Sequence, residues 1–260
     1  MKKLLLSMSV VAIVLFSACS SDDSGSDLPQ NNAPSGSLVK VEIIHPEENF
    51  RTTTTYSFNA EGKVVNAIEE GWSASQYLRA IYTYFYNSNG QIRMLSIMVD
   101  GSTEYTEFIY TDGLITSSER HSISGNVSRT VYNYNDDNQL INKHFFNSDN
   151  EEYAMSNFSF DVNGNIESRH EERNFGAEII DYTFEYDTYN NPLKTPFENQ
   201  EMNKIVGHSF NNITKSIRSD DFLTSEVNIE YTYNEAGYPL TSKEYSNGDL
   251  LVEVTYTYQE

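Results

Sequence analysis

In the segment Val227-Asn228-Ile229-Glu230-Tyr231-Thr232-Tyr233, apolar and polar residues alternate along the whole length. A period of two residues predicts a β-strand with one dry face and one wet face. The turn-forming segment Asn234-Glu235-Ala236-Gly237 follows, and Leu240 then opens a second apolar stretch. Because Asn and Gly tolerate the positive φ angles of tight turns, the two stretches form a predicted β-hairpin.

The same sequence motif recurs along the chain, mostly every 24 to 28 residues. It consists of two aromatic residues separated by one residue, then a polar turn, then a branched aliphatic residue. Repetition at a nearly constant period predicts a repeat architecture, and it indicates that these aromatic residues serve packing rather than chemistry. The aromatic pairs are Tyr56/Phe58, Tyr84/Tyr86, Phe108/Tyr110, Tyr132/Tyr134, Phe158/Phe160, Phe184/Tyr186, Tyr231/Tyr233 and Tyr256/Tyr258. The return strands are expected to begin near Val64, Ile92, Ile115, Leu140, Ile166, Leu193, Ile213 and Leu240.

Each unit is therefore a predicted hairpin, and the chain has room for roughly 16 to 18 antiparallel strands of typical length. The fold class is all-β: an antiparallel meander of tandem hairpins that forms a curled or flattened barrel-like sheet. One stretch interrupts the rhythm, and within it residues 198–204 are predicted to form a short helix or a long loop. The bases Lys143, Arg169 and Lys243 on return strands are expected opposite acidic residues of neighbouring strands.

The first eighteen residues form a predicted signal peptide, in which Lys2 and Lys3 precede an apolar run too short to span a bilayer. The junction Ser17-Ala18-Cys19 resembles the lipobox of bacterial lipoproteins, which implies that Cys19 becomes the acylated first residue. An ordinary secretory peptide with an unrelated cysteine is the alternative. Since Cys19 is the only cysteine, we expect no disulfide, metal thiolate or catalytic thiol.

Residues 19–37 form a predicted flexible acidic tether, because they are mostly small and polar. Their aspartates resemble the export signal that sends lipoproteins of the Bacteroidota to the outer face of the outer membrane; a plain solvated linker is the alternative. Residues 38–260 form one predicted β-hairpin repeat domain. The net charge of −21 becomes −23 once Lys2 and Lys3 leave with the signal peptide, which disfavours nucleic acid as a partner.

Two segments, Phe184–Leu193 and Tyr231–Leu240, look like degenerate YD (RHS-type) repeats. With the signal peptide and the tether, the chain resembles a family of uncharacterised Bacteroidota lipoproteins described as having a porin-like fold. This resemblance implies a porin-like all-β domain and a lipid anchor. It implies no activity, and no functional residue other than the lipidated Cys19.

Two motifs resemble metal sites, but each lacks a residue that such a site requires. His170-Glu171-Glu172 would need a second histidine where Asn174 stands. The segment Asp161–Asn165 has the spacing of a calcium loop, but Ile166 replaces the required glycine, so a hairpin turn is the favoured interpretation. We therefore expect no metal or other cofactor.

No catalytic constellation emerges from the remaining polar residues. The carboxylate pairs Glu151-Glu152 and Asp220-Asp221 fall in predicted solvated loops, and the histidines have no evident nucleophile partner. Trp72, the only tryptophan, is expected as a lid over one end of the core; an exposed aromatic that stacks on a sugar or a partner is the alternative.

The dry faces of the strands are expected to converge on one interior. A round barrel of ~16 strands leaves a lumen, so the sheet must flatten, stay open with its dry face covered, or hold an apolar ligand. We expect a flattened or partly open barrel with a groove. The residues expected inside include Tyr182, Phe184, Tyr186, Val227, Ile229, Tyr231, Tyr233, Val254, Tyr256 and Tyr258.

These features favour a non-enzymatic lipoprotein of the cell surface or outer membrane, which binds an apolar or lipid-like ligand, a glycan or a partner protein. A structural or assembly module of an envelope complex is the alternative, and a glycan hydrolase is the less favoured third. The domain itself is not expected to be embedded in the membrane, because return strands such as Glu167–Arg173 have no apolar face.

Overall fold

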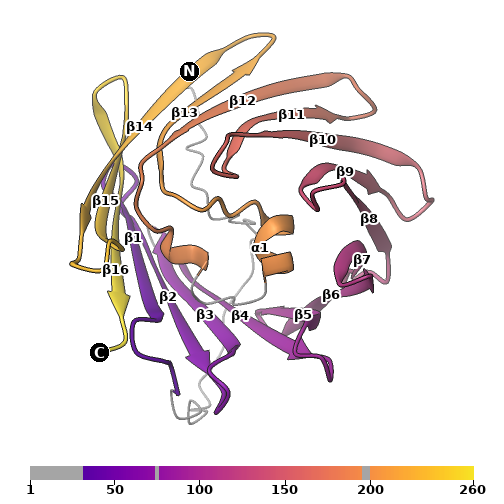
Figure 1. Ribbon diagram of the computed structural model, residues 1–260, viewed down its shortest axis with the longest axis horizontal. Helices are drawn as coiled ribbons and strands as arrows, with labels where there is room; N and C mark the ends of the chain where they lie inside the picture. Colours follow the sequence, from indigo (N-terminus) through magenta and orange to yellow (C-terminus); the bar gives the residue numbers. More distant parts are fainter. Residues whose placement is uncertain (1–31, 74–75, 195–199) are drawn as a thin grey trace.

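The computed structural model describes residues 32–73, 76–194 and 200–260, so the predicted signal peptide and Cys19 lie outside the described residues. Within this part of the chain, sixteen antiparallel strands form one closed barrel (Figure 1). The strands are β1 (Leu38–His45), β2 (Phe50–Phe58), β3 (Val64–Ser73), β4 (Gln76–Tyr86), β5 (Ile92–Val99), β6 (Ser102–Thr111), β7 (Leu114–His121), β8 (Val127–Tyr134), β9 (Leu140–Phe146), β10 (Glu152–Phe160), β11 (Ile166–Arg173), β12 (Glu178–Tyr186), β13 (Ile213–Asp220), β14 (Thr224–Tyr233), β15 (Pro239–Ser246) and β16 (Asp249–Tyr258).

The barrel closes where the first strand pairs with the last. Val41 of β1 lies opposite Tyr256 of β16, and Ile43 lies opposite Val254. Closure leaves no unpaired strand edge. The all-β antiparallel fold class is confirmed. The expectation of a partly open sheet is wrong, because this pairing completes the ring.

The dry face of the sheet points into the barrel. All ten residues expected inside are buried or half-buried, while the residues between them, such as Thr183, Glu230 and Thr255, are exposed. A cluster of buried apolar side chains joins β1, β2, β3 and β16, and another joins β5, β7, β8 and β9 to a helix inside the barrel. Side-chain alternation therefore sets which residues form the core.

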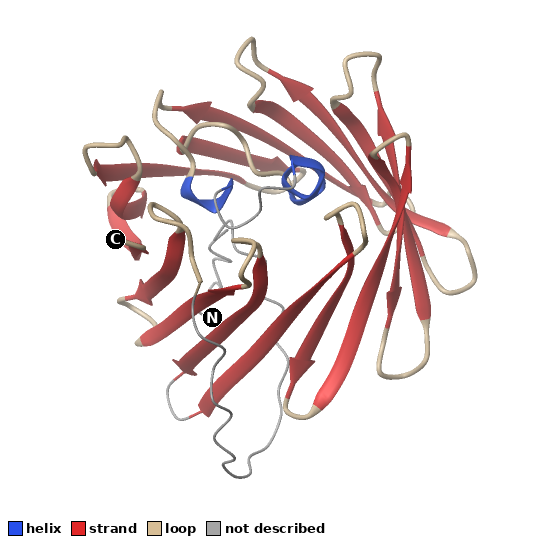
Figure 2. Ribbon diagram, turned by 60° about the horizontal axis from the view of Figure 1, so that its bottom comes forward, coloured by secondary structure: helices blue, strands red, loops and turns tan. Residues whose placement is uncertain are grey.

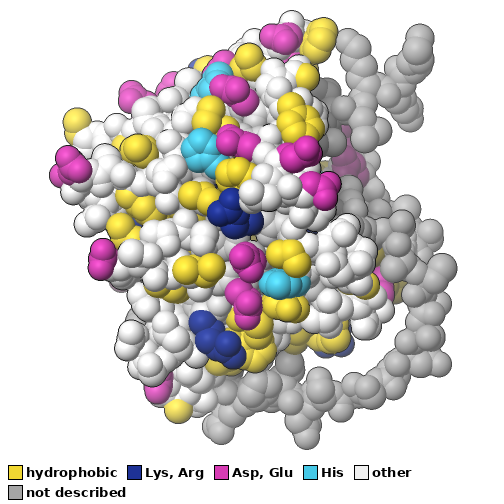
Figure 3. Space-filling model, turned by 90° about the vertical axis from the view of Figure 1, so that its right-hand side faces the viewer, with side chains coloured by type: hydrophobic (Ala, Val, Ile, Leu, Met, Phe, Trp, Pro, Cys, Tyr) yellow, Lys and Arg dark blue, Asp and Glu magenta, His cyan; other side chains and the backbone are white. Residues whose placement is uncertain are grey.

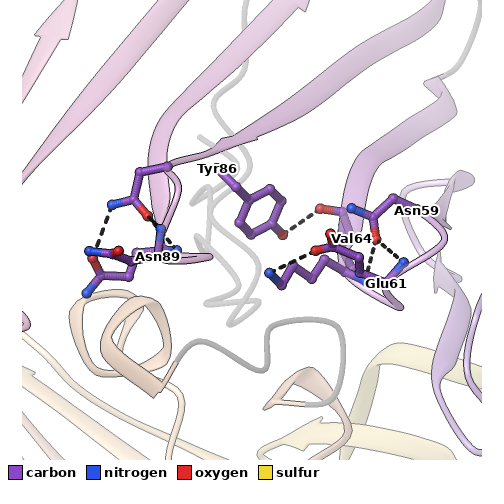
Figure 4. A network of polar contacts seen from close by, with 8 residues as sticks. Asn59, Glu61, Val64, Tyr86 and Asn89 are labelled. Carbon is purple, nitrogen blue, oxygen red and sulfur yellow. Dashed lines mark hydrogen bonds and ion pairs between the residues drawn. The ribbon is translucent and has the colours of Figure 1, made fainter.

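In five of the repeats an Asn or Asp side chain stabilises the turn between the two strands. In the first unit the Asn59 side-chain oxygen accepts hydrogen bonds from the backbone N–H groups of Glu61 and Lys63, and Gly62 adopts a φ of 77° (Figure 4). The pairing of β2 with β3 shifts register just before this turn, between Ser57 and Phe58, the second aromatic residue of the unit. Asn87, Asn135, Asp161 and Asn234 make the equivalent contacts.

Tyrosine hydroxyls join consecutive units. The Tyr86 hydroxyl donates a 2.6 Å hydrogen bond to the carbonyl of Val64, at the start of the preceding return strand (Figure 4). Such a bond satisfies a hydroxyl on the inner face and fastens one hairpin to the next. Equivalent bonds join Tyr110 to Ile92, Tyr134 to Ile115, Tyr186 to Ile166, Tyr231 to Ile213 and Tyr258 to Pro239.

The segment between β12 and β13 enters the barrel, and we call its described residues, 187–194 and 200–212, the plug. It contains a 3-10 turn, η1 (Pro192–Lys194), and the helix α1 (Gln200–Val206), both of which lie within the ring of strands (Figures 1 and 2). Met202 and Ile205 of α1 pack on the core cluster of β5, β7, β8 and β9. No helix in the described part of the chain is long and apolar enough to cross a membrane.

The helix confirms the prediction for residues 198–204 over its described part, but the return strand expected near Leu193 is wrong. Pro192 has no backbone N–H and a restricted φ, so it disfavours continuation of a strand ladder. The Asn191 side chain instead accepts a hydrogen bond from the Leu193 N–H, which stabilises the turn. Ile213 then begins β13, as expected.

Residues just before β1 also contact the barrel. Ala33 packs against the core cluster of β1, β2, β3 and β16, and the Gly36 N–H donates to the carbonyl of Gln259. The end of the expected tether therefore meets the barrel at the end where the chain finishes.

Candidate functional site

A cavity of about 80 Å³ lies inside the barrel, between η1 of the plug and the wall formed by β1 and β13–β16. Its lining is mostly aliphatic, and Tyr231 and Tyr256 add aromatic rings. The aliphatic residues come from several strands and from the plug: Val41, Ile43, Leu193, Ile213, Ile229, Val252 and Val254. This composition, with few polar groups, is typical of sites for small ligands.

Glu244 places a carboxyl group in this apolar wall. It lies on the inner face of β15, opposite Ile229 of β14 and Val252 of β16, and it is 8% exposed. Among the described residues it has no hydrogen-bond or ion-pair partner, and loss of hydration alone raises its pKa to about 7. A buried carboxyl without a partner is unusual, because most buried polar groups are paired.

The other polar side chains of the lining have hydrogen-bond partners of their own. The Tyr231 hydroxyl donates to the Ile213 carbonyl at 3.0 Å, and the Ser242 hydroxyl lies 3.4 Å from that of Tyr256. The side-chain amide of Asn191 donates to the Ser209 carbonyl, and that of Asn212 donates to Asp187. Among the described lining residues, Glu244 is therefore the polar group with which a ligand can form a new hydrogen bond or ion pair.

Strand geometry explains why Glu244 has no basic partner. Its neighbour Lys243 points outward, because successive strand residues face opposite sides of the sheet, and it pairs with Glu253 at 3.1 Å. The expectation for Lys243, an acid on the neighbouring strand, is confirmed. For Lys143 and Arg169 the same expectation is wrong, because both lie on inward-facing positions.

Lys143 fastens the plug to the wall. Its ammonium group donates a hydrogen bond to the carbonyl of Ile205 in the last turn of α1 and lies 5.2 Å from the centre of the Phe158 ring. Cations favour helix C-termini. Burial lowers the pKa of Lys143 to about 8. Arg169 pairs with Glu171 on its own strand, at 2.9 Å, and lies over the ring of Tyr182.

In the structure, the side chains of the two motifs that resemble metal sites make other contacts. In β11, Glu171 faces inward, and His170 faces outward beside Asp181 at 2.7 Å, so the two cannot share an ion. Asp161 is occupied by the backbone N–H groups of its own turn, which confirms the hairpin interpretation. The described residues contain no group of three or more His, Cys, Asp or Glu side chains that could hold a metal.

Three further expectations need correction. Trp72 lies in β3 rather than in a loop, is 62% exposed and packs beside Tyr77, so it does not cover the core. Glu152 and Asp220 are terminal strand residues rather than loop residues, and Asp220 pairs with Arg218 at 2.5 Å.

Sequence reasoning missed Glu244 and the cavity. The available signal was the alternation of inward and outward side chains. Val252 and Val254 face inward on β16, and residues directly opposite each other in a sheet face the same side, so their partners Glu244 and Ser242 on β15 face inward as well. To use this signal one must know which residues of β15 lie opposite which residues of its neighbours. That register is irregular: it shifts between Thr232 and Tyr233 where β14 pairs with β15, and between Glu244 and Tyr245 where β15 pairs with β16.

No protein-family model matches the sequence, and no curated protein matches it either. Among solved structures, a porin-like protein from Bacteroides uniformis matches with a TM-score of 0.62 and 15% identity, over 87% of this chain and 100% of that chain. A porin-like protein from Bacteroides vulgatus gives a TM-score of 0.44 and 11% identity, over 86% of this chain and 99% of that chain. The first of these likenesses shows that this chain has the fold of a porin-like barrel protein.

Proposed function

We propose that the protein is a non-enzymatic, lipid-anchored barrel of the outer membrane that holds a small ligand between its plug and its wall. The cavity beside Glu244 carries this proposal, since it combines a mostly aliphatic lining with one addressable polar group. An engineered cavity of about 150 Å³ in another protein holds benzene. The smaller volume here favours a ligand of a few heavy atoms over a long acyl chain.

The outer wall supports a lipid anchor rather than an embedded barrel. Outward-facing charges pair across strands, as in Lys215 with Glu226 at 3.0 Å and Arg79 with Glu70 at 3.2 Å. One side of the wall carries charged side chains and histidines among scattered apolar ones (Figure 3). Charges on the lipid-facing side of a transmembrane barrel are costly. The lipobox at Cys19 and the resemblance to Bacteroidota lipoproteins support the same attachment.

The polar groups of the cavity support binding over catalysis. They comprise one carboxyl, two phenols, a serine and two amides. Among these described groups the Ser242 hydroxyl contacts the hydroxyl of Tyr256 and makes no hydrogen bond to the Glu244 carboxyl, so no activated nucleophile is formed.

An assembly module remains a second candidate, because exposed apolar side chains occupy one rim of the barrel. In a meander all hairpins that lead from an odd-numbered to an even-numbered strand lie at the same end. These hairpins or their flanking strand ends carry Trp72, Ile123, Phe175 and Phe222, all of them exposed. Exposed apolar patches mark interaction surfaces.

Native mass spectrometry of the mature protein tests the proposal. We expect an acyl mass on Cys19 and, on the intact barrel, a small non-covalent adduct or saturable binding of small alcohols and amines. A Cys19→Ala variant should lose the acyl mass and the membrane fraction. A wild-type protein without the acyl mass contradicts the anchor. A barrel that binds no small probe contradicts the ligand site, and a stable complex with another protein favours the assembly role.

A further inference from the structure

We infer that the cavity beside Glu244 is a binding site for a small organic cation, such as a methylated amine or a quaternary ammonium group. The inference rests on the proposed ligand site and adds the chemistry of the ligand. The central observation is the Glu244 carboxyl, 8% exposed, without a partner among the described residues and in the lining of a cavity.

The lining suits a cation with an apolar body. Methyl groups of Val41, Val252 and Val254 offer van der Waals contacts to N-methyl groups. The rings of Tyr231 and Tyr256 line the same space, and aromatic faces attract organic ammonium ions. A buried carboxylate is stabilised by an opposite charge, which an alcohol or a hydrocarbon does not supply.

An anionic ligand lacks the groups that it would need. The described residues that line the cavity include no Lys, Arg or His. The lining hydroxyls of Tyr231 and Ser242 are engaged with other groups, as are the amides of Asn191 and Asn212. The net charge of the chain, −21, adds a field that favours cations.

The size of the cavity restricts the cation to a few heavy atoms. Its volume of about 80 Å³ is roughly half that of an engineered cavity that admits benzene. Tetramethylammonium is therefore a suitable probe: it is compact and carries a charge that does not titrate. The alcohol 2-methyl-2-propanol is its neutral counterpart of similar size.

Binding of a permanent cation should follow the ionisation of Glu244. The pKa of this carboxyl is raised to about 7 by burial, so its charge appears as the pH rises from 5.5 to 8. The facing titratable groups are Tyr231 on β14 and Tyr256 on β16, and both phenols stay neutral because burial raises their pKa. β1 contributes only Val41 and Ile43 to the lining.

In the plug, two charged groups adjoin residues of the lining, and both make contacts of their own. The ammonium of Lys194 lies 3.2 Å from the centre of the Phe210 ring. Asp187 accepts hydrogen bonds from Asn212 and from the Tyr233 hydroxyl. Neither residue lines the cavity.

Isothermal titration calorimetry on the mature lipidated protein, in a non-ionic detergent, tests the inference. We expect saturable binding of tetramethylammonium that tightens at least about tenfold from pH 5.5 to pH 8, and at least about tenfold weaker binding of 2-methyl-2-propanol at pH 8. A tenfold change corresponds to about 1.4 kcal/mol.

The Glu244→Gln variant keeps the size of the side chain and removes its charge. It should bind tetramethylammonium at least about tenfold more weakly at pH 8 and lose the pH dependence. The matched control Glu253→Gln, which changes an outward-facing carboxylate of β16, should behave like the wild type. If Glu244→Gln does not fold, the wild-type protein alone still tests the inference, through the pH dependence of tetramethylammonium binding and the comparison of the two probes.

Equal affinity for the two probes, or unchanged cation binding by Glu244→Gln, overturns the cation site and leaves a neutral-ligand site standing. Absence of tetramethylammonium binding also overturns it. The proposed ligand function falls only if neutral small probes fail to bind as well.

Discussion

Position decides the chemistry of single residues in this barrel. Glu69 and Glu244 both face inward, and burial raises the pKa of both carboxyl groups. Glu69, however, accepts a 3.2 Å hydrogen bond from the hydroxyl of Tyr82, whereas Glu244 meets aliphatic side chains. Two residues of one type thus differ in reactivity through their neighbours.

Replacement of Glu244 by Gln should make the protein more stable at neutral pH. The pKa of Glu244 is about 7 in the folded state against an ordinary 4.5, so the folded state binds more protons between these values. The free energy of unfolding therefore falls as pH rises from 4.5 to 7, by up to about 3 kcal/mol at about 1.4 kcal/mol per pKa unit. Glu244→Gln has no carboxyl group at this position, so its free energy of unfolding should not fall for this reason.

Urea unfolding of both proteins at pH 4.5 and pH 7.5 measures the difference. His208, whose pKa burial lowers to about 4, contributes the opposite slope over this range, but equally in both proteins. Only the difference between variant and wild type therefore reports on Glu244. A difference that is the same at both pH values would contradict a buried, unpaired carboxyl.

At the scale of the elements, the tyrosine hydroxyls hold neighbouring hairpins together. Tyr110→Phe removes the 2.9 Å bond to the Ile92 carbonyl and should lower the free energy of unfolding by about 1 kcal/mol. The control is Tyr105→Phe. It removes an outward-facing hydroxyl but keeps the ring that stacks on His121, so it should lower the free energy of unfolding by less than about 0.5 kcal/mol. Equal losses in urea unfolding would argue against the role of these bonds.

The plug depends on Lys143 for its attachment. Lys143→Met keeps the apolar stem but removes the donor to the Ile205 carbonyl. A hydrogen bond to a charged group contributes about 1.5–3 kcal/mol, so amide exchange in α1 should accelerate roughly 10- to 100-fold. The matched control Lys243→Met, on the outer wall, should leave exchange in α1 unchanged. Faster exchange in the strands but not in α1 would contradict this attachment.

At the scale of the whole molecule, the two core clusters lie inside the barrel, and ion pairs such as Lys215–Glu226 and Lys243–Glu253 lie on its outer wall. We therefore expect the mature chain with Cys19→Ser to stay monomeric in buffer without detergent, because its outer wall offers water many charged groups. Size-exclusion chromatography with light scattering measures this. Aggregates that only detergent disperses would indicate an outer wall that requires lipid.

The repeat units were predictable because their determinants are local. The turns depend on residues such as Asn59 and Gly62, which contact each other within one hairpin. The face that each strand buries follows from alternation alone, and Val64, Ile92, Leu140, Ile166 and Ile213 begin strands as expected.

The hairpins, their turns and their dry faces are local features, since each arises from residues close together along the chain. The closure is not local, because it brings Leu38 against Tyr258 from the far end of the chain. The position of α1 and the side chains around Glu244 likewise depend on contacts between distant segments. Alternation assigns a side chain to the inside, but the packing of distant segments determines which inward groups meet and which charges stay unpaired.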